Sequence, residues 1–583
     1  MPIPKIIHQT AQNKDIKEPY RSFQGKLLSL HPDWDYYFYD DRDCRNTVAE
    51  QFPVLLPIYD SFTTNVQRAD MFRVVAVYSH GGVYVDLDAE CLQPLDGLCE
   101  CNCVLSEEKT LTVDEARKLG HEHTLRIANY MFASEPNHLF MLHLLLEMVE
   151  RCRKPVISED DVLESTGPGL MTDTYHACKD RLRDIVLLRN MDRVCPAGCG
   201  GVSCHFGNYA RHYHLGSWRP GKERSLISPG PKRKKLAKED AKRASGAIKS
   251  EVEKRQPDSP PYVLQTYQDI AYDGLSTVFQ RCLAIGSPID DSKRLKDKKV
   301  LVVGVPFRYM DRISPSNTNV VYTTFESTEL PKSWVQAIND CYQHCIVPHE
   351  SVQTVFRDSG VKIPIEVVHQ GFTRYRRRRR SFSVNRLFRV GFLGVPTRRK
   401  NLYKLFEACS SLQTQIPGLK LVVHVPTFYQ WLDRSETRII RSAQFVEWSE
   451  GRWTEEKLAD WFHDLSCYVF PSSGEGWSFT PRESLYLGVP TIISDIPVHD
   501  ELVASGFCKV IGSKRLEDAQ FEGNNTFGQW HCFDTEDIAR AIMDVYKNYG
   551  SYSIRSLQGS HWIENKWPNE SMQQRVLTFL NGI

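Results

Sequence analysis

Short apolar strands alternate with helices along the chain from Tyr262 onward, and this alternation constrains the fold more than any other feature. Helices such as Ser333–Tyr342 and Leu402–Leu412 are expected between the strands. The expected strands are Lys299–Val305, Asn319–Thr324, Cys345–Pro348, Arg389–Leu393, Leu419–His424, Cys467–Pro471 and Thr491–Ser494. Because such alternation produces parallel sheets, and the chain is long enough for two, we predict two α/β domains with a break near Gly371–Asn385.

The front of the chain has a different character. Residues 1–218 mix short strands, helices and aromatic-rich loops, whereas 219–259 are charged, rich in Ala and Lys, and poor in large apolar side chains. Such a segment cannot bury a core and is typical of a linker. The predicted parts are an N-terminal domain at 1–222, a charged linker at 223–259 and a C-terminal region at 260–583, whose halves are 260–380 and 381–583.

Composition excludes several classes of protein. The formal net charge is +1 over 583 residues, which gives no bulk attraction for nucleic acid. No apolar run of about 18 residues appears, so we expect no transmembrane segment. Met1–Thr10 lacks the long apolar core of a signal peptide. The 17 cysteines are odd in number and scattered, which is typical of free thiols in a reducing compartment, and we expect a cytoplasmic protein.

The sequence does not assign a role to three clusters of side chains. They are Cys99, Cys101 and Cys103; Cys195, Cys199 and Cys204 with the adjacent His205; and Arg376–Arg380. The second cysteine cluster offers ligands for a structural zinc, but its spacing is not that of a standard knuckle. The arginine run is either a solvated loop or a contact for a phosphate-bearing acceptor or an anionic membrane surface.

A helix and a glycine pair precede a short strand in the front half. Gln67–Tyr78 is a predicted helix on which Asp70 and Arg73 share one face, since they are three positions apart. Gly81 ends this helix, and Val83–Val85 is a predicted strand.

Two acids, Asp86 and Asp88, follow this strand. Because side chains alternate along a strand, we expect both carboxylates to point the same way. Paired oxygen ligands suit Mg²⁺ or Mn²⁺, and such an ion can neutralise a nucleotide diphosphate leaving group. The alternative is a pair of solvated acids at a strand end.

These motifs, together with Ile3–Gln9, resemble glycosyltransferase family 32, the "DXD sugar-binding region" family, which includes yeast-type initiating α-mannosyltransferases. Further matches are Ser165–Pro168, Tyr209–His212 and Gly216–Trp218. The resemblance implies a GT-A fold with a single mixed nucleotide-binding sheet, a nucleotide-sugar donor, a divalent metal and retention of anomeric configuration.

The resemblance also implies roles for single residues. Asp86 and Asp88 would act in catalysis and would bind Mn²⁺ or Mg²⁺ together with His212, although His214 is an alternative to His212. The implied donor-binding residues are His8, Gln9, Asp70, Arg73 and Trp218.

A second pair of acids, Glu475 and Glu483, stands eight positions apart in the segment 467–494, which is predicted to form strand, loop, helix, turn and strand. Pro481 suits the first helical turn and Gly488 suits the C-terminal cap. We expect Glu475 in the loop at the carboxyl end of a strand and Glu483 in the first turn of the helix. Ligands of open parallel sheets bind at this edge, and a diphosphate can bind at a helix N-terminus.

This string resembles the Glu-x₇-Glu motif of retaining glycosyltransferases with the GT-B fold, especially family 4, over about residues 260–583. Other matches are Asp273–Ser276, Tyr322–Pro331, Val347–Ser351, Phe392–Gly394 and Arg398–Asn401. The resemblance implies two Rossmann-like halves and no required metal, because basic side chains and a helix dipole stabilise the diphosphate instead.

By this second resemblance, Glu475 would contact the transferred sugar in catalysis and Glu483 the ribose. Gly394, Arg399 and Lys400 would bind the donor diphosphate. Val395 stands where the family often has a basic residue, so the choice among Arg398, Arg399 and Lys400 for the phosphate contact stays open.

Both resemblances together predict a bifunctional retaining glycosyltransferase that moves hexosyl or pentosyl groups from UDP- or GDP-linked sugars to a growing glycan or glycoconjugate. Two alternatives remain. One module alone is catalytic while the other binds acceptor, or the whole chain is a carbohydrate-binding scaffold without turnover.

Overall fold

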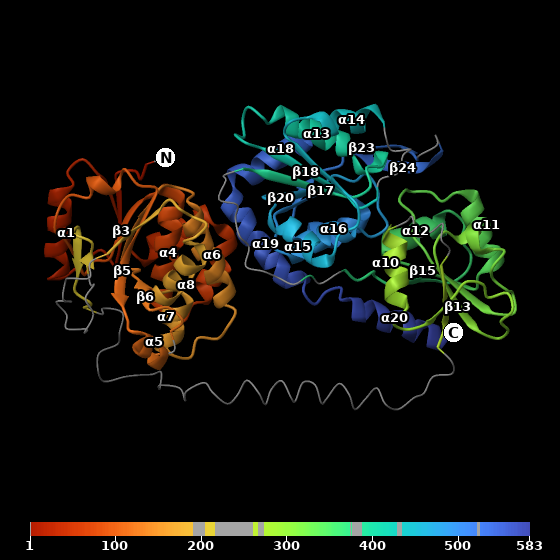
Figure 1. The fold of residues 1–583 in the computed structure, drawn as a ribbon, viewed down its shortest axis with the longest axis horizontal. Coiled ribbons are helices and arrows are strands. Elements are labelled where there is room, and N and C mark those ends of the chain that lie inside the picture. The colour runs from red at the N-terminus through yellow and green to blue at the C-terminus, as the bar shows by residue number, and fades with distance from the viewer. Residues whose placement is uncertain are drawn as a thin grey trace. The chain divides into compact units, whose positions relative to one another are not determined.

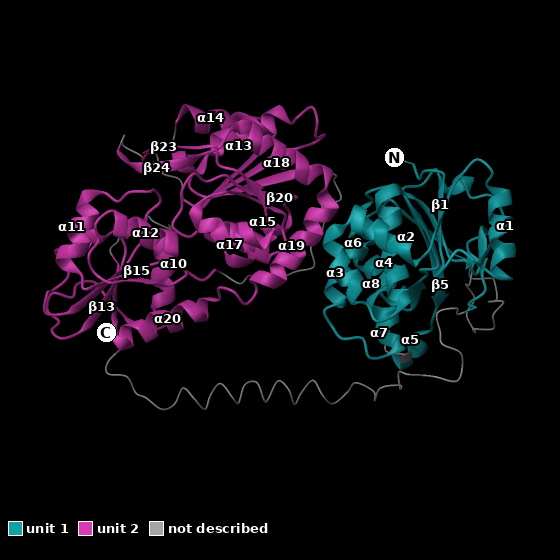
Figure 2. Ribbon diagram, turned by 180° about the vertical axis from the view of Figure 1, so that it is seen from behind, with its two compact units in different colours: residues 1–235 teal, residues 236–583 magenta. Residues whose placement is uncertain are grey.

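The structure is a computed structural model, and it divides the chain into two compact units, residues 1–235 (unit 1) and 236–583 (unit 2), coloured separately in Figure 2. It describes residues 2–119, 121–189, 205–215, 260–265, 273–372, 375, 387–427, 434–521 and 525–583. The predicted linker, Trp218, the second cysteine cluster apart from His205, and the arginine run 376–380 lie outside the described residues.

A seven-stranded mixed sheet forms the centre of unit 1, with the order β2-β1-β3-β7-β5-β6 and with β8 beside β5. Its strands are β1 (Ile6–Thr10), β2 (Asp35–Tyr39), β3 (Gly82–Val85), β5 (Cys103–Thr110), β6 (Leu125–Ile127), β7 (Met131–Ser134) and β8 (Ile185–Leu188). β1 pairs in parallel with β2 and β3, whereas β7 runs antiparallel to β3 and β5. The prediction of a mixed sheet is confirmed, but unit 1 also contains a separate three-stranded antiparallel sheet of β4 (Ala89–Cys91), β10 (Ala210–His212) and β9 (His205–Phe206).

Helix α4 (Asn65–His80) is the central helix of unit 1 and packs against α2 and α6. It begins where the Thr64 side chain accepts a hydrogen bond from the Gln67 amide, and it ends before Gly81, whose φ of 70° is suited to glycine. Most of its side chains are buried on every face, as in a helix enclosed by the core. The other helices are α1 (Tyr20–Leu30), α2 (Asp41–Gln51), α3 (Leu56–Ser61), α5 (Val113–Leu119), α6 (Leu139–Arg151), α7 (Glu159–Ser165) and α8 (Pro168–Cys178).

Unit 2 contains two six-stranded sheets, and every pairing within them is parallel. The first has the order β12-β11-β13-β14-β15-β16, and the second has the order β19-β18-β17-β20-β21-β22. The predicted pair of Rossmann-like halves is confirmed.

The strands of the first half are β11 (Tyr262–Leu264), β12 (Ser287–Ile289), β13 (Lys299–Val303), β14 (Thr318–Tyr322), β15 (His344–Val347) and β16 (Ile365–Val367). Those of the second half are β17 (Arg389–Leu393), β18 (Lys420–Val425), β19 (Val446–Glu450), β20 (Cys467–Phe470), β21 (Thr491–Ser494) and β22 (Lys509–Ile511). An antiparallel hairpin, β23 (Arg515–Gln520) with β24 (Thr526–Cys532), follows β22 and was not predicted.

Helices cover both sheets of unit 2 and also join its halves. The helices are α10 (Asp273–Cys282), α11 (Lys332–Cys341), α12 (Glu350–Asp358), α13 (Leu402–Ser411), α14 (Ser435–Ser442), α15 (Glu455–His463), α16 (Phe479–Tyr486), α17 (Asp500–Ser505), α18 (Thr535–Lys547), α19 (Tyr549–Ile563) and α20 (Asn569–Gly582). Figure 1 shows α20 beside α10, so the end of the chain packs on the first half of the unit. Met572 and Val576 of α20 belong to the same buried cluster as Leu301 of β13.

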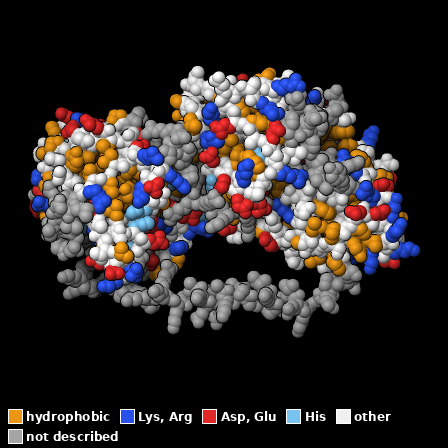
Figure 3. Space-filling view, viewed as in Figure 1, with side chains coloured by type: hydrophobic (Ala, Val, Ile, Leu, Met, Phe, Trp, Pro, Cys, Tyr) orange, Lys and Arg blue, Asp and Glu red, His pale blue; other side chains and the backbone are white. Residues whose placement is uncertain are grey.

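The surface carries mixed charge, which agrees with the small net charge. In Figure 3, basic and acidic side chains intermingle over the visible face of each unit. In the part of the chain that the structure describes, no helix combines the length and apolar character needed to cross a membrane.

Candidate functional sites

Asp86 and Asp88 lie in a turn of unit 1 that connects β3 to β4 (Ala89–Cys91). The strand ends at Val85, and the Ala89 amide donates to the Asp86 carbonyl at 3.1 Å. The prediction that strand alternation aligns these two carboxylates is therefore wrong. The turn brings them together instead, because it folds the chain back within three residues.

His212 lies beside the same turn, although it is 124 positions from Asp88 in the sequence. Strand β10 (Ala210–His212) pairs antiparallel with β4 and places His212 opposite Ala89. The His212 Nε2 atom lies 3.1 Å from Asp88 Oδ1, and its ring stacks on Tyr130 at 4.1 Å. His214 packs edge-on against His212, so the geometry favours His212 over His214 as the residue that meets the acids.

The two acids have different electrostatic surroundings. Burial works to raise the pKa of Asp88, but the hydrogen bond and charge of His212 and the Leu215 amide outweigh it, so the pKa is lowered. Burial raises the pKa of Asp86, and the charge of Arg73 opposes this only in part. The His212 pKa is raised, because its bond to Asp88 outweighs the effect of burial.

Arg73 connects helix α4 to this turn. Its Nη2 atom lies 2.9 Å from Asp70 Oδ1, and its Nη1 atom lies 3.5 Å from Asp86 Oδ1. Asp70 also accepts hydrogen bonds from Thr166 Oγ1 at 2.8 Å and from Asn129 Nδ2 at 3.2 Å. Burial raises the Asp70 pKa to about 6, against the lowering effect of Arg73. The predicted Asp70–Arg73 face is thus joined to the predicted acids.

His8 and Gln9 lie on β1 and are almost completely buried. His8 Nε2 contacts the Gly81 carbonyl at 2.9 Å, and burial lowers the His8 pKa to about 4. The Gln9 Oε1 atom accepts a hydrogen bond from Tyr36 at 3.0 Å. Both side chains bond within the protein, and their predicted donor contact stays a prediction.

The residues at the turn fit a divalent cation. One ligand atom each of Asp86, Asp88 and His212 lies within 4.8 Å of the others, and His212 Nδ1 is buried without a hydrogen-bond partner among the described residues. Two carboxylate oxygens and one imidazole nitrogen match the donor preferences of Mn²⁺ and also accept Mg²⁺.

In unit 2, Glu475 lies in the loop between β20 and α16, as predicted. Its Oε1 atom accepts hydrogen bonds from Arg399 Nη1 and from Ser472 Oγ, the latter at 2.7 Å, and lies 3.7 Å from Lys400 Nζ. Burial works to raise the Glu475 pKa, but the charges of Arg399 and Lys400 outweigh it and the pKa is lowered. The side chain is only 8% exposed.

The three candidates for the phosphate contact, Arg398, Arg399 and Lys400, differ in their position relative to Glu475. Arg398 is exposed and its Nη1 atom lies 3.4 Å from Gln520, whereas Arg399 and Lys400 both face Glu475. Gly394 has φ of 149°, and a Cβ there would lie 3.3 Å from Lys400 Nζ. The geometry therefore favours Arg399 and Lys400 over Arg398.

Glu483 lies on α16 and is 6% exposed. The helix begins at Phe479, after Ser478 with φ of 70°, so Glu483 lies in its second turn rather than the first turn that we predicted. Its negative charge acts on Arg281 of the first half of the unit. Gly488 ends the helix with φ of 71°, as predicted.

Glu326 follows β14 in the first half of unit 2 and lies in the matched segment Tyr322–Pro331, but the sequence analysis gave it no role. Its Oε1 atom lies 3.5 Å from Arg399 Nη2, and Trp530 Nε1 of the hairpin donates to the Glu326 carbonyl at 2.7 Å. Burial raises the Glu326 pKa, and Arg399 opposes this in part. The pair is 73 positions apart in the chain, so no local pattern could have indicated it.

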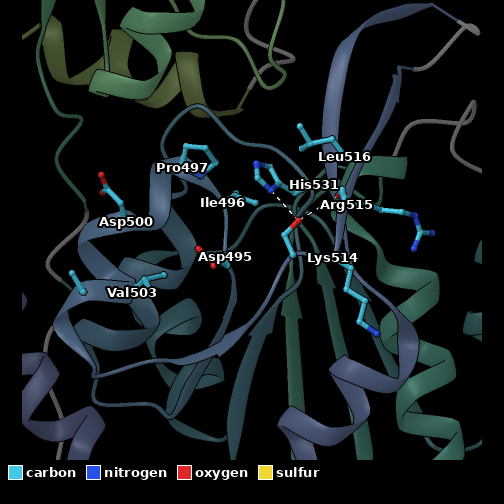
Figure 4. A pocket seen from close by; sticks show the side chains of 11 residues that line it. Asp495, Ile496, Pro497, Asp500, Val503, Lys514, Arg515, Leu516 and His531 are labelled. Atoms are coloured by element: carbon cyan, nitrogen blue, oxygen red, sulfur yellow. Dashed lines mark hydrogen bonds between the residues drawn. The ribbon is translucent and has the colours of Figure 1, made fainter.

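A pocket of about 570 Å³ lies beside the Glu475 loop, lined by residues that follow β21 and by the hairpin (Figure 4). The His531 amide donates to the Ser473 carbonyl at 3.1 Å, so the pocket and the loop share a wall. In Figure 4 the side chains of Lys514 and Arg515 extend away from His531, and they pair with Asp534 and Glu517 at 2.8 and 2.7 Å. Neither predicted glutamate lines this pocket.

Comparisons with known proteins agree with both resemblances. The family described as "Glycosyltransferase sugar-binding region containing DXD motif" matches residues 18–110, and "Glycosyl transferases group 1" matches residues 376–523. The class that the folds and sites define is therefore that of the glycosyltransferases, as predicted, with one such region in each unit.

Curated relatives match part of the chain. "Inositol phosphoceramide mannosyltransferase 2" of Schizosaccharomyces pombe is 44% identical over 180 residues, which cover 31% of this chain and 48% of that protein. "Mannosyl phosphorylinositol ceramide synthase SUR1" of Saccharomyces cerevisiae is 31% identical over 166 residues, which cover 28% and 40%. The chain thus spans less than half the length of these relatives.

Among solved structures, the Anabaena protein HepE in complex with UDP is similar, with a TM-score of 0.41 and 11% identity. The match covers 56% of this chain and 100% of that one.

Proposed function

We propose that the chain is a bifunctional retaining glycosyltransferase. Unit 1 transfers one sugar with Mn²⁺ or Mg²⁺, and unit 2 transfers another without a metal, from UDP- or GDP-linked donors to a growing glycan or glycoconjugate. One observation carries the proposal. In each unit the predicted carboxylates lie together, but the groups beside them that could balance the charge of a diphosphate differ. Asp86 and Asp88 meet His212, whereas Glu475 meets Arg399 and Lys400.

In unit 1, Asp86, Asp88 and His212 would hold the ion, which when bound would supply Lewis-acid stabilisation of the leaving diphosphate. Arg73 orients Asp86 through their 3.5 Å contact, and its charge opposes the rise that burial causes in the pKa of Asp70. Asp70 would then accept hydrogen bonds from donor-sugar hydroxyls. His8, Gln9 and Trp218 remain proposed donor-binding residues.

The curated relatives support a more specific proposal for unit 1. Their names describe mannosyl transfer to inositol phosphoceramide. We therefore propose mannose as the sugar that unit 1 transfers, and a phosphate-bearing glycoconjugate as its acceptor.

In unit 2, Glu475 would contact the transferred sugar and Glu483 the ribose. The positive charges of Arg399 and Lys400 would stabilise the diphosphate as negative charge develops on it. Gly394 would let the diphosphate approach the backbone closely, since no side chain stands there.

We further propose a cytoplasmic location. Its support is that all fourteen cysteines in the described ranges are free thiols, which is typical of a reducing compartment. Fractionation of cells that express the full chain tests this point.

Donor hydrolysis by the full chain, screened over GDP-mannose, UDP-glucose and UDP-N-acetylglucosamine with Mn²⁺ and with EDTA, tests the function. Two donors should be consumed, one only with metal and one in either condition. Turnover of a single donor would favour one catalytic module beside an acceptor-binding one. Glycan binding without any turnover would favour the scaffold.

A further inference from the structure

The cluster around Glu475 contains an acid from the opposite half of unit 2. Glu326 follows β14 in the first half, yet its side chain lies 3.5 Å from Arg399 Nη2. On its other side, Arg399 donates from Nη1 to Glu475 and to the Gly474 carbonyl, the latter at 3.0 Å. One guanidinium thus bridges two carboxylates, one from each half of the unit.

The backbone of Glu326 is fixed by three neighbours. Trp530 donates to its carbonyl at 2.7 Å, and a Cβ on Gly474 would lie 2.2 Å from the same oxygen. The adjacent Phe325 stacks on Phe521 of the hairpin loop at 5.3 Å. Because these contacts restrain the loop, they limit the positions that the Glu326 carboxylate can adopt.

The two basic residues of the cluster have different surroundings. The terminal nitrogens of Arg399 face carboxylates and a carbonyl, and the side chain is 16% exposed. Lys400 lies farther from Glu475, at 3.7 Å, and its ammonium is directed toward Gly394 and over the Phe470 ring. An arginine that already bridges two acids is arranged to orient them, whereas Lys400 faces the glycine at the end of β17.

We propose that Glu326 is a positioning residue of unit 2, which holds Arg399 against Glu475 from across the two halves, and that Lys400 rather than Arg399 makes the main diphosphate contact. This inference rests on the proposed function of unit 2. If Glu326 has this role, the orientation of Glu475 depends on the packing of the two halves of unit 2 at the 323–329 loop.

The test compares Glu326→Gln with Glu329→Gln in the full chain, in EDTA so that only metal-independent turnover is observed. Glu329 is on the same loop, is exposed and has no ion pair among the described residues, so it is a matched control. Donor hydrolysis is measured with the best metal-independent donor, and binding of UDP and GDP is measured by calorimetry. Glu326→Gln should slow hydrolysis roughly ten- to hundredfold, because Glu475 loses its orientation.

The affinity of Glu326→Gln for a nucleotide should rise, although its rate of hydrolysis falls. Removal of one negative charge near the diphosphate site should tighten UDP or GDP binding roughly three- to tenfold. A fold that is merely damaged would weaken both binding and turnover, and that result would overturn the inference. Equal behaviour of Glu326→Gln and Glu329→Gln in both measurements would also overturn it.

A second pair of variants separates the two basic side chains. Lys400→Met should weaken UDP or GDP binding at least tenfold more than Arg399→Met does, and an equal or larger loss with Arg399→Met would contradict the inference. If the unaltered chain neither binds a nucleotide nor consumes a donor in EDTA, the proposed function of unit 2 fails, and the inference falls with it.

Discussion

The two candidate sites differ in how they compensate the charge of a diphosphate. In unit 1, Asp70 and Asp86 lie against Arg73, and Asp88 lies against His212, so three acids face two basic side chains. In unit 2, Glu475 and Glu326 lie against Arg399 and Lys400, so two acids face two permanent cations. The first site therefore gathers negative charge that calls for an added cation, whereas the second carries its cations on the chain. The ratio of acids to bases at a site, rather than the presence of acids, therefore indicates a need for metal.

Metal removal should have the largest effect and should separate the two sites. EDTA should lower metal-dependent donor turnover by roughly a thousandfold, because the leaving diphosphate loses its Lewis acid. Metal-independent turnover should be unchanged. Parallel hydrolysis assays with GDP-mannose and UDP sugars measure both in one sample.

Restoration with Mn²⁺ provides the control for that experiment. Turnover of the affected donor should return in full. Equal loss of both activities in EDTA would show that the two sites do not differ in the way that the geometry indicates.

Single substitutions should then dissociate the sites. Asp88→Asn should lower only the metal-dependent turnover, and Glu475→Gln only the other, each by roughly 100- to 1,000-fold, since each removes a charge that acts in the transition state. Initial rates with each donor provide the measurement. Asp114→Asn, at an exposed position in unit 1, is the control. Loss of both activities from either change would argue for one shared site.

Acid should destabilise unit 2 through a buried histidine. His499 is fully buried behind the Glu475 loop, where it contacts the Ser494 carbonyl at 2.8 Å and Ser478 Oγ at 3.0 Å. Burial lowers its pKa to about 4, and the charge of Arg482 adds to this effect. The unfolded chain then binds more protons between about pH 6.5 and 4, so stability is full above that window and falls by up to about 3 kcal/mol as pH drops through it.

Tryptophan fluorescence during urea unfolding can measure this loss. All but two of the eleven tryptophans lie beyond residue 235, so the signal reports mainly on unit 2. The free energy of unfolding of His499→Gln should depend less on pH between 6.5 and 4. The same pH dependence in both proteins would assign the acid sensitivity to another group.

Much of the fold could be predicted from sequence because its strands are apolar runs bounded by turn residues. Arg389–Leu393 and Thr491–Ser494 were predicted with the bounds observed for β17 and β21. The β23–β24 hairpin was missed, because most of β23 is exposed and polar and lacks such a pattern.

The sites were predictable only where a motif is local in sequence. Asp70 and Arg73, or Glu475 and its loop, are recognisable because their spacing is short. Glu326 was not, since its partner is 73 positions away, and Asn129 was not, since Asp70 is 59 positions away. Such contacts depend on how strands are ordered in a sheet, which single-sequence patterns do not specify.

The smallest expected effect concerns a feature of unit 2 only, namely the close approach of its two halves. A Cβ at Gly476 would lie 1.7 Å from Thr324 Oγ1, so Gly476→Ala must displace the first-half loop. Metal-independent turnover should fall about tenfold because Glu475 shifts, while metal-dependent turnover stays constant. Initial rates with both donors measure this.

The control is Gly512→Ala, because nothing lies within 4 Å of its Cβ position and the change should have no effect. Adding Thr324→Gly to Gly476→Ala removes the clash and should restore most of the lost rate. If the double variant is no faster than Gly476→Ala alone, the loss comes from the Glu475 loop itself rather than from contact between the halves. In that case the position of Glu475 is set within the second half of unit 2 alone.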